Sequence, residues 1–405
     1  IHIPFCPKLC WYCGCNTKIT RKYEPVKSYT DLLLEEIDMT ARALGTPKRR
    51  LSHIHFGGGS PTMLEARDFA QIMRSIRGSF AMTSGANIDI EIDPRNLTEG
   101  RIATYAKQGI NRASIGAQDF NPETLKAVNR EQPFHLSYKA MRLLRSYGIK
   151  DINLDIMYGL PHQTVKTMQE TIEKALMLAP SRIAFFGYAH VPWMKKHMRL
   201  IDENFLPDKS LRYDLLQMGT ELLIKHGYQQ IGIDHFVREG DSLLKAYKEH
   251  KLHRNFQGYT TDNAPHLIGL GVSSISKVDG HYIQNAPDMP VYKKHIEAQE
   301  LACVKSCHIT KDDKLRAEII EELMCYHECN IPNLCIKHSF SIKHLQSSLR
   351  ALQPFIEKDY VSYDQSGNLV IMKTGKLLTR IICSCFDAYL PNASEAQKPR
   401  HAASI

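Results

Sequence analysis

The sequence has no apolar run long enough to cross a bilayer and no signal-peptide layout at its start. It also lacks the interleaved basic and aromatic residues that grip single-stranded nucleic acid, because its basic residues are scattered in short clusters such as Lys48-Arg49-Arg50. No initiator methionine precedes Ile1, and we expect that an N-terminal segment is missing. These absences exclude a membrane span, argue against a nucleic-acid partner and favour a cytoplasmic protein.

The composition is that of an ordinary globular protein. The chain has 405 residues, of which 43% are hydrophobic and 23% are charged. This length allows one large core and a smaller domain. The formal net charge of +9 indicates an anionic partner, and either a nucleic acid or a small polycarboxylate would fit such a field. Charge alone leaves the class of partner open.

The sequence contains 11 cysteines, which without a secretory signal indicate a reducing compartment and thiol chemistry rather than disulfides. The later ones include two C-x3-C pairs that have no third partner at a useful spacing. We predict that these later cysteines are buried as small apolar residues. They are Cys303, Cys307, Cys325, Cys329, Cys335, Cys383 and Cys385.

The remaining cysteines, Cys6, Cys10, Cys13 and Cys15, lie together on a loop that leaves a short apolar strand. Thiolates at this spacing can converge on one metal centre. A structural zinc site usually pairs two such groups of cysteines, and no second group follows within reach. Three thiolates can instead hold three irons of a 4Fe–4S cluster and leave the fourth iron open to a ligand.

A predicted strand over 51–56 runs directly into Gly57-Gly58-Gly59. Glycines at the end of a strand let the backbone approach a ligand without side chains in the way. A helix with Tyr29, Leu33 and Ile37 on one face separates this strand from the cysteine loop. A glycine turn alone is a weak signal, but its place after the cysteine loop, one helix and one strand makes ligand binding a specific prediction.

Polar side chains alternate with apolar or small ones along three further predicted strands, over 88–93, 113–118 and 152–156. A parallel strand covered by helices is apolar on its outer face. A period of two then places the polar side chains on the inner face, near the carboxyl ends of the strands, where ligands bind. The residues predicted there are Asp89, Glu91, Asp93, Gln118 and Asp155.

Helices predicted over 98–107, 134–147 and 165–178 separate these strands, and a last strand is predicted over 182–191. The count is about six strand–helix units, so the predicted fold class is α/β, an incomplete (β/α)6 barrel. A long helix over 207–226 follows, and then long loops that favour a covering for the barrel mouth.

The composition changes at Thr310, where Thr310-Lys311-Asp312-Asp313 is a capping box that opens a helix. A second helix over 342–352, a hairpin turning at Gly367-Asn368 and a final helix through Phe386 follow. This order predicts a smaller, mostly helical domain that contains a β-hairpin and is winged-helix-like. We expect it to pack or to serve as a lid rather than to bind DNA.

The stretch from His2 to Cys15, with its spacing H-I-P-F-C-x3-C-x2-C-G-C, resembles the radical S-adenosylmethionine (SAM) enzymes and, among them, the oxygen-independent coproporphyrinogen III oxidases. The resemblance covers essentially the whole chain. It implies a radical SAM catalytic domain over 1–310 and a helical, winged-helix-like domain over 311–405, with a frayed tail from Pro391. Further motifs carry it: 57–62, 91–95, 116–120, 128–130, 155–161, 188–190, 254–259 and 271–273.

The resemblance implies Cys6, Cys10 and Cys13 as cluster ligands and, together with Glu91, as the catalytic residues. Cys15 is the extra cysteine of the family and is not expected to bind iron, and both a spare thiol and a catalytic role stay open for it. The family binds two SAM molecules, of which Gly58 and Glu91 would contact the first. The other implied SAM contacts, mostly to the second molecule, are Tyr12, Gly59, Ser60, Gln118, Arg130, Asp155, Ala189 and Ile275, with Phe256 and Gln257 flanking it.

The resemblance also implies the reaction, the oxidative decarboxylation of two propionate side chains of coproporphyrinogen III to vinyl groups, which gives protoporphyrinogen IX in anaerobic haem biosynthesis. A 5′-deoxyadenosyl radical, formed from SAM at the 4Fe–4S cluster, would remove a hydrogen from each propionate. The family further implies a monomer and an electron donor such as a flavodoxin or ferredoxin.

Three alternatives stay open. A non-catalytic haem chaperone on the same frame tends to lack the cysteine that stands here as Cys15, and the stretch 254–261 also counts against it. An RNA-modifying radical SAM protein would need an appended basic domain, and the last part of the chain is not notably basic. A structural zinc protein would be colourless and lack cluster absorbance.

Overall fold

The computed structural model describes residues 1–390. Residues 391–405, where the frayed tail is expected, lie outside the described part. The chain divides into two compact units, the first formed by Ile1–Leu222 and Ala264–His308, and the second by Leu223–Asn263 and the chain from Ile309 onward. The two domains predicted from sequence, 1–310 and 311–405, stay a prediction.

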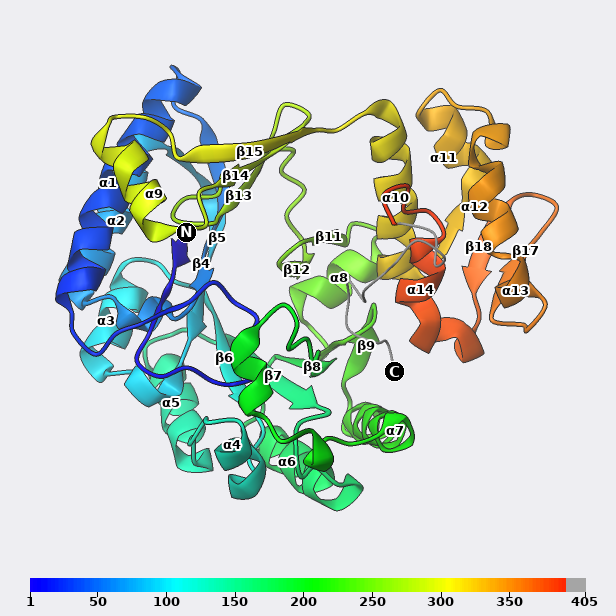
Figure 1. Cartoon of the computed structure of the whole chain (residues 1–405), viewed down its shortest axis with the longest axis horizontal. Helices are drawn as coiled ribbons and strands as arrows, with labels where there is room; N and C mark the ends of the chain where they lie inside the picture. Colours follow the sequence, from blue (N-terminus) through cyan, green and yellow to red (C-terminus); the bar gives the residue numbers. More distant parts are fainter. Residues whose placement is uncertain (391–405) are drawn as a thin grey trace. The chain divides into compact units, whose positions relative to one another are not determined.

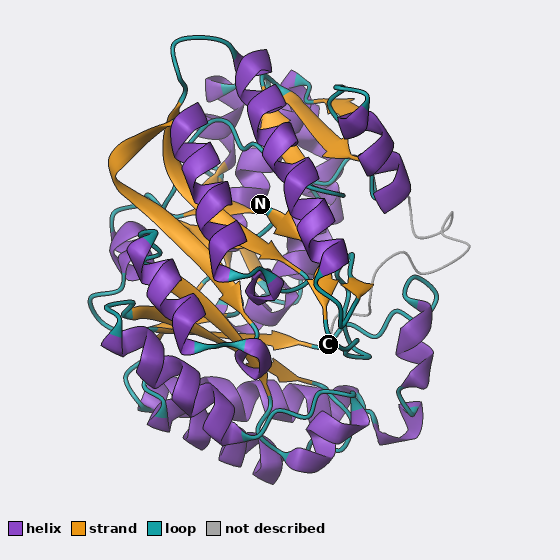
Figure 2. Ribbon diagram, turned by 90° about the vertical axis from the view of Figure 1, so that its left-hand side faces the viewer, coloured by secondary structure: helices purple, strands orange, loops and turns teal. Residues whose placement is uncertain are grey.

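The first unit is built on parallel strands in the order β1-β4-β5-β6-β7-β8. Each strand but the first follows a helix in sequence, and Figure 2 shows purple helices running alongside the orange strands. This arrangement confirms the predicted α/β class and the incomplete (β/α)6 barrel. The strands are β1 (His2–Ile3), β4 (Arg50–Gly58), β5 (Ala81–Ile92), β6 (Arg112–Gln118), β7 (Asp151–Tyr158) and β8 (Arg182–Gly187).

The helices of this unit present one apolar face to the strands. Helix α1 (Glu24–Leu44) buries Tyr29, Leu33 and Ile37, as predicted, and ends at Gly45, whose φ of 73° favours glycine. Among the described residues, no helix is long and apolar enough to span a membrane. The other helices are α2 (Ala66–Ser79), α3 (Glu99–Lys107), α4 (Pro122–Ala127), α5 (Phe134–Ser146), α6 (Val165–Met177) and α7 (Lys209–Lys225).

The period-two prediction holds on β5. Ile88, Ile90 and Ile92 are buried, whereas Asp89 and Glu91 point to the other face. The strand predicted over 182–191 is shorter in the structure, where β8 ends at Gly187. Single-turn 3-10 helices follow several strands, at Pro61–Met63, Pro94–Asn96, Lys196–Leu200 and Glu203–Phe205.

Smaller elements complete the first unit. A parallel pair, β2 and β3, flanks the cysteine loop, and an antiparallel sheet in the order β13-β14-β15 follows the stretch 264–274. The blue N-terminus and the strand β4 lie close together in Figure 1. The bounds are β2 (Phe5–Cys6), β3 (Lys18–Ile19), β13 (Ile275–Val278), β14 (His281–Asn285), α9 (Met289–Glu297) and β15 (Cys303–His308).

The second unit is mostly helical and contains two antiparallel pairs, β9–β10 and β11–β12, and a three-stranded sheet in the order β16-β18-β17. The capping box at Thr310 is present, and β17 and β18 form the predicted hairpin. The bounds are α8 (Ser242–Lys248), β9 (Gln229–Ile231), β10 (His235–Val237), β11 (His253–Asn255), β12 (Gly258–Thr260), α10 (Lys311–Tyr326), β16 (Glu328–Asn330), α11 (Ile331–Lys337), α12 (Gln346–Ala351), α13 (Gln353–Ile356), β17 (Val361–Tyr363), β18 (Asn368–Ile371) and α14 (Thr379–Ser384), with 3-10 helices at Ile342–Leu345 and Lys373–Leu378.

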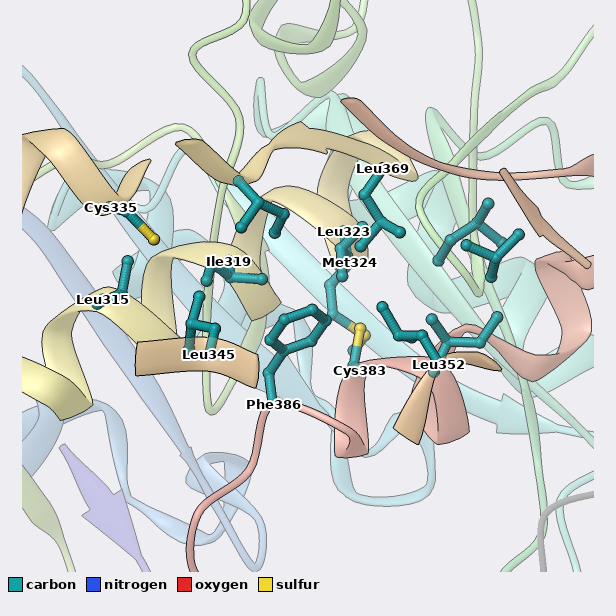
Figure 3. Packing of buried hydrophobic residues seen from close by; sticks show 14 residues of the cluster. Leu315, Ile319, Leu323, Met324, Cys335, Leu345, Leu352, Leu369, Cys383 and Phe386 are labelled. Carbon is teal, nitrogen blue, oxygen red and sulfur yellow. The ribbon is translucent and has the colours of Figure 1, made fainter. Parts of the chain in front are cut away.

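The core of the second unit is apolar and includes cysteines. Figure 3 shows Leu315, Ile319 and Leu323 of α10 packed with Cys335 and Cys383. Two helices differ from the prediction: the stretch 342–352 is a 3-10 turn followed by a short α-helix, and the last helix ends at Ser384. All 11 cysteines of the chain are free. The prediction that the later cysteines are buried is wrong for Cys303 and Cys307, which are exposed because they lie on the edge strand β15 of the first unit.

Candidate active site

The cysteine loop leaves β2 at Cys6 and passes through Cys10, which is buried, and Cys13, which is half-buried. In the residues that the structure describes, no three histidine, cysteine, aspartate or glutamate side chains converge closely enough to hold a metal ion. The three thiols are nevertheless free and share one short loop. They form the donor set that a 4Fe–4S cluster with one open iron requires, so the residues present fit this group.

A turn far away in the sequence fixes the loop. The backbone N–H of Trp11 donates to the carbonyl of Val128 at 3.0 Å, and the side-chain amide of Asn129 donates to the carbonyl of Leu9 at 2.7 Å. Asn129 has a φ of 58°, a left-handed conformation that asparagine adopts more easily than most residues. The motif 128–130 thus positions the cysteine loop.

Two guanidinium groups face the sulfur of Cys10. Nη1 of Arg130 lies 3.5 Å from Sγ of Cys10, and Nη2 of Arg95 lies 3.7 Å from the same atom. Arg130 is only 7% exposed. Arg95 also pairs with Asp93 at 2.6 Å. Burial opposes the ionisation of Asp93, but the hydrogen bond from Arg95 and the charge of Arg130 outweigh it and lower the pKa of this carboxyl group.

The last two cysteines of the loop, Cys13 and Cys15, shift each other's pKa. The side chain of Cys15 lowers the pKa of Cys13 to about 6, although burial acts in the opposite direction. The side chain of Cys13 in turn raises the pKa of Cys15. Burial raises the pKa of Cys6 to about 12.

The glycine turn at the end of β4 leaves no room for side chains. Gly58 has a φ of 122°, and a Cβ atom there would overlap the ring of His2. A Cβ atom at Gly59 would lie 2.9 Å from the backbone nitrogen of Phe5. Glycine is therefore needed here because the end of β4 packs closely against His2, Pro4 and Phe5. That a ligand approaches this turn stays a prediction.

Glu91 faces this turn from β5. Its carboxylate accepts a hydrogen bond from the backbone N–H of Gly58 at 3.1 Å and lies 3.2 Å from Nε2 of His55. Partial burial opposes its ionisation, but His55 and the Gly58 amide lower its pKa. Asp89, two residues earlier, pairs with His53 at 2.8 Å on the same face. Glu91 is therefore an ionised group held against the glycine turn.

The end of β6 holds a second group of buried polar atoms. Nη2 of Arg130 donates to the carbonyl of Gly116 at 2.6 Å. Gln118 has a φ of 72° and is buried. Neither Oε1 of Gln118 nor Nε of Arg130 has a hydrogen-bond partner within residues 1–390. Buried polar atoms without partners are costly, and these two are suited to contact a ligand.

Asp155 lies on the neighbouring strand β7, where it pairs in register with Gly116 of β6. Its carboxylate accepts hydrogen bonds from the amide of Asn153 at 2.7 Å and from the hydroxyl of Ser114 at 3.2 Å. The inner face of β6 and β7 is thus polar, as the alternation in the sequence predicts.

The structure does not draw every predicted residue into these groups. Tyr12 packs beside an apolar cluster that includes Val128 and Leu160. Phe256, which is 55% exposed, and Gln257 belong to the second unit, at the turn between β11 and β12. Three others lie elsewhere in the first unit: Ser60, buried and bonded to Thr62; Ala189, exposed after β8; and Ile275, at the start of β13.

Residues of the site that had no assigned role in the sequence analysis include Arg95, Asn129, His55 and Asn153. The alternation along β7 could have identified Asn153, because it lies two residues before Asp155. His55 likewise alternates with the apolar residues of β4. No local pattern indicates that Arg95 and Asn129 meet the cysteine loop, since these contacts join distant parts of the chain.

Comparison with known proteins first identifies the class of enzyme to which this chain belongs. Residues 1–175 match the family model of the Radical SAM superfamily. The solved structure of coproporphyrinogen III oxidase from Escherichia coli, described as a radical SAM enzyme, matches with a TM-score of 0.92 at 36% identity, over 96% of this chain and 89% of that chain. The fold and the cysteine loop are those of a radical SAM oxidoreductase, for which an iron–sulfur cluster and SAM are the cofactors.

Two curated relatives then give the family. The oxygen-independent coproporphyrinogen III oxidase of Bradyrhizobium diazoefficiens is 40% identical over 96% of this chain and 86% of its own length. The enzyme of the same name from Paracoccus denitrificans is 42% identical, with the same two shares. This chain belongs to the oxygen-independent coproporphyrinogen III oxidase family. The comparisons support this family and not the haem-chaperone alternative.

Proposed function

We propose that this protein converts two propionate side chains of coproporphyrinogen III into vinyl groups and so produces protoporphyrinogen IX. Each conversion removes one hydrogen atom, carbon dioxide and one further electron from the propionate. The identity to curated oxidases over 96% of the chain carries the proposal. The polar inner face of β5, β6 and β7, next to the cysteine loop, supports it.

Cys6, Cys10 and Cys13 would hold the cluster as a 4Fe–4S centre. When bound, the cluster and SAM supply a 5′-deoxyadenosyl radical that takes a hydrogen from the substrate. The cations of Arg95 and Arg130, within 3.7 Å of the sulfur of Cys10, balance the negative charge that thiolates bring to the centre.

The side chains around the cluster loop would bind and orient two SAM molecules. Gly58 and Glu91 would contact the first, since the ionised carboxylate of Glu91 suits the ammonium group of the methionyl part. The buried, unpartnered Oε1 of Gln118 and Nε of Arg130 support ligand contacts at the end of β6. The remaining proposed contacts, carried over from the family resemblance, are Tyr12, Gly59, Ser60, Asp155, Ala189, Ile275, Phe256 and Gln257.

The protein's own contribution is to hold the ligands and to keep the radical from other reactions. The glycine turn would present its backbone to a ligand, and Asn129 fixes the loop that carries the thiols. A one-electron donor such as a flavodoxin or ferredoxin, and a monomeric state, complete the proposal.

An anaerobic turnover assay tests it. The reconstituted protein would receive SAM, a one-electron reductant and coproporphyrinogen III, and chromatography would quantify 5′-deoxyadenosine and the tetrapyrroles. We expect divinyl product to form together with 5′-deoxyadenosine, and neither without SAM. Cluster absorbance and haem binding without decarboxylated product would overturn the proposal in favour of a chaperone.

A further inference from the structure

A cavity of about 570 Å³ opens beside the cysteine loop in the first unit. This volume is in the range of small-molecule sites. Four separate segments of the first unit form its wall, so it is not the gap of a single loop. The wall consists of Gly14, Cys15, Asn16, Thr17, Met194, Lys195, Lys196, His197, Ser273, Gln284 and Pro287.

The cavity wall carries cationic side chains and no carboxylate. Lys195 and Lys196 both line it, together with His197. Neither lysine forms an ion pair with an aspartate or glutamate in the described chain, whereas many other lysines there do, such as Lys8 with Glu131. Two lysines without acidic partners on one concave wall favour an anionic ligand.

Hydrogen bonds to the cysteine loop fix the position of these cations. Nζ of Lys195 donates to the carbonyl of Cys15 at 3.4 Å. Nε2 of His197 lies 2.7 Å from the carbonyl of Cys13. The segment 194–197 is therefore tied to the loop that carries the thiols, and a carboxylate bound by Lys195 would lie next to that loop.

We propose that this cavity is a subsite for a propionate carboxylate of the tetrapyrrole substrate, with Lys195 as its main ligand and Lys196 as the second. The inference rests on the proposed function. The substrate carries four propionates, and those that are not reacting remain anionic and need cationic partners when they leave water. A cationic wall beside the cysteine loop holds one such arm while another propionate faces the radical.

Binding of coproporphyrin III, the stable and fluorescent oxidised form of the substrate, tests the subsite without turnover. Fluorescence titration of the reconstituted protein would compare wild type with Lys195→Gln, Lys196→Gln and the double variant. We expect the dissociation constant to rise about fivefold for Lys195→Gln, less for Lys196→Gln and more for the pair, which is the scale of a partly exposed ion pair. Lys195→Arg keeps the charge and should restore binding.

Two controls isolate the charge. Lys139→Gln removes an exposed lysine of α5 that does not line the cavity, and it should leave the titration unchanged. Coproporphyrin III tetramethyl ester lacks carboxylates, so its affinity should be the same for wild type and Lys195→Gln. An equal loss with the ester, or wild-type affinity in the double variant, would overturn the subsite.

SAM also carries a carboxylate, and turnover distinguishes the two sources. In the anaerobic assay, Lys195→Gln should raise the KM for coproporphyrinogen III about fivefold and leave the KM for SAM unchanged. A rise in the KM for SAM alone would assign the cavity to that cofactor and overturn the inference, while the proposed function stands. If wild type neither binds coproporphyrin III nor turns over, the proposed function and this inference both fail.

Discussion

Cys10 and Cys13 of the cysteine loop differ in their surroundings from the cysteines in the core of the second unit. In the first unit, Cys10 faces two guanidinium groups, and the neighbouring Cys15 lowers the pKa of Cys13 to about 6. In the second unit, Cys335 and Cys383 lie in an apolar core, where burial raises the pKa of both and brings that of Cys383 to about 12. The neighbours of a cysteine, not its presence, separate a metal ligand from a packing residue.

The sequence already distinguishes the two groups by spacing. The four cysteines that end at Cys15 share one loop, whereas those after Cys303 have no third partner within reach. The structure adds a physical reason: polar contacts fix the cysteine loop, whereas apolar side chains surround Cys335 and Cys383 in the second unit. Substitutions at the cysteine loop should therefore act on chemistry, and those of cysteines in the core of the second unit on stability.

Of the substitutions considered, Cys10→Ala should impair the function of the cysteine loop most severely. Removal of a proposed ligand leaves two thiols, so cluster content should fall strongly, and activity should fall by more than about a hundredfold, beyond the loss typical for groups that only support a ligand. Iron and sulfide analysis, cluster absorbance and 5′-deoxyadenosine formation would measure it. Retention of a full cluster by this variant would show that other side chains bind the iron.

Arg130→Lys should weaken the same region without removing a ligand. Lysine cannot reproduce the fork with which Arg130 contacts both Cys10 and the carbonyl of Gly116. We expect a loss of about tenfold to a hundredfold in kcat/KM. Cluster content and the reduction potential, measured beside activity, separate an effect on the centre from an effect on folding. An unchanged potential with unchanged activity would contradict the role given to this cation.

Local periodicity predicts most of the frame. The alternation of Ile88, Ile90 and Ile92 with acidic residues gave the inner and outer faces of β5, because a strand has a period of two whatever its neighbours are. The grouping of residues 223–263 with the chain from 309 onward has no local signal, since it depends on contacts between distant segments. Helix ends such as that of α14 also depend on tertiary contacts.

The candidate site was also predictable from the sequence only in part. Glu91 and Gly58 were identified from the strand and the glycine turn, and the structure places them in contact. The contact of Asn129 with Leu9 joins residues 120 positions apart and depends on how distant segments of the first unit pack together. Sequence patterns name the residues of individual elements, but the pairing of those residues across elements needs the fold.

Glu36 gives the stability of the first unit a pH dependence. This carboxyl group is 2% exposed. It accepts hydrogen bonds from the backbone N–H of Gly271, the amide of Asn285 and the hydroxyl of Tyr292. Burial raises its pKa above the ordinary value of 4.5, although these bonds act in the opposite direction. Between 4.5 and the raised value the folded state binds more protons than the unfolded state, so stability falls as the pH rises.

Glu36→Gln should lower the free energy of unfolding by about 1–3 kcal/mol at acidic pH, because an amide cannot accept three donors. Since the variant does not titrate, its deficit relative to wild type should shrink as the pH rises through that window. Both tryptophans, Trp11 and Trp193, lie in the first unit, so their fluorescence during urea unfolding reports on it. A deficit that grows with pH would contradict the raised pKa.

Cys335→Ala should have the smallest effect and is the sharpest test of the comparison. Cys335 is 1% exposed in the apolar core, and loss of its sulfur leaves a small cavity that costs about 1 kcal/mol. Calorimetry would measure that cost, while iron content and 5′-deoxyadenosine formation should match wild type. If this variant lost the cluster, a cysteine of the second unit would be a ligand, and packing could no longer account for the thiols found there.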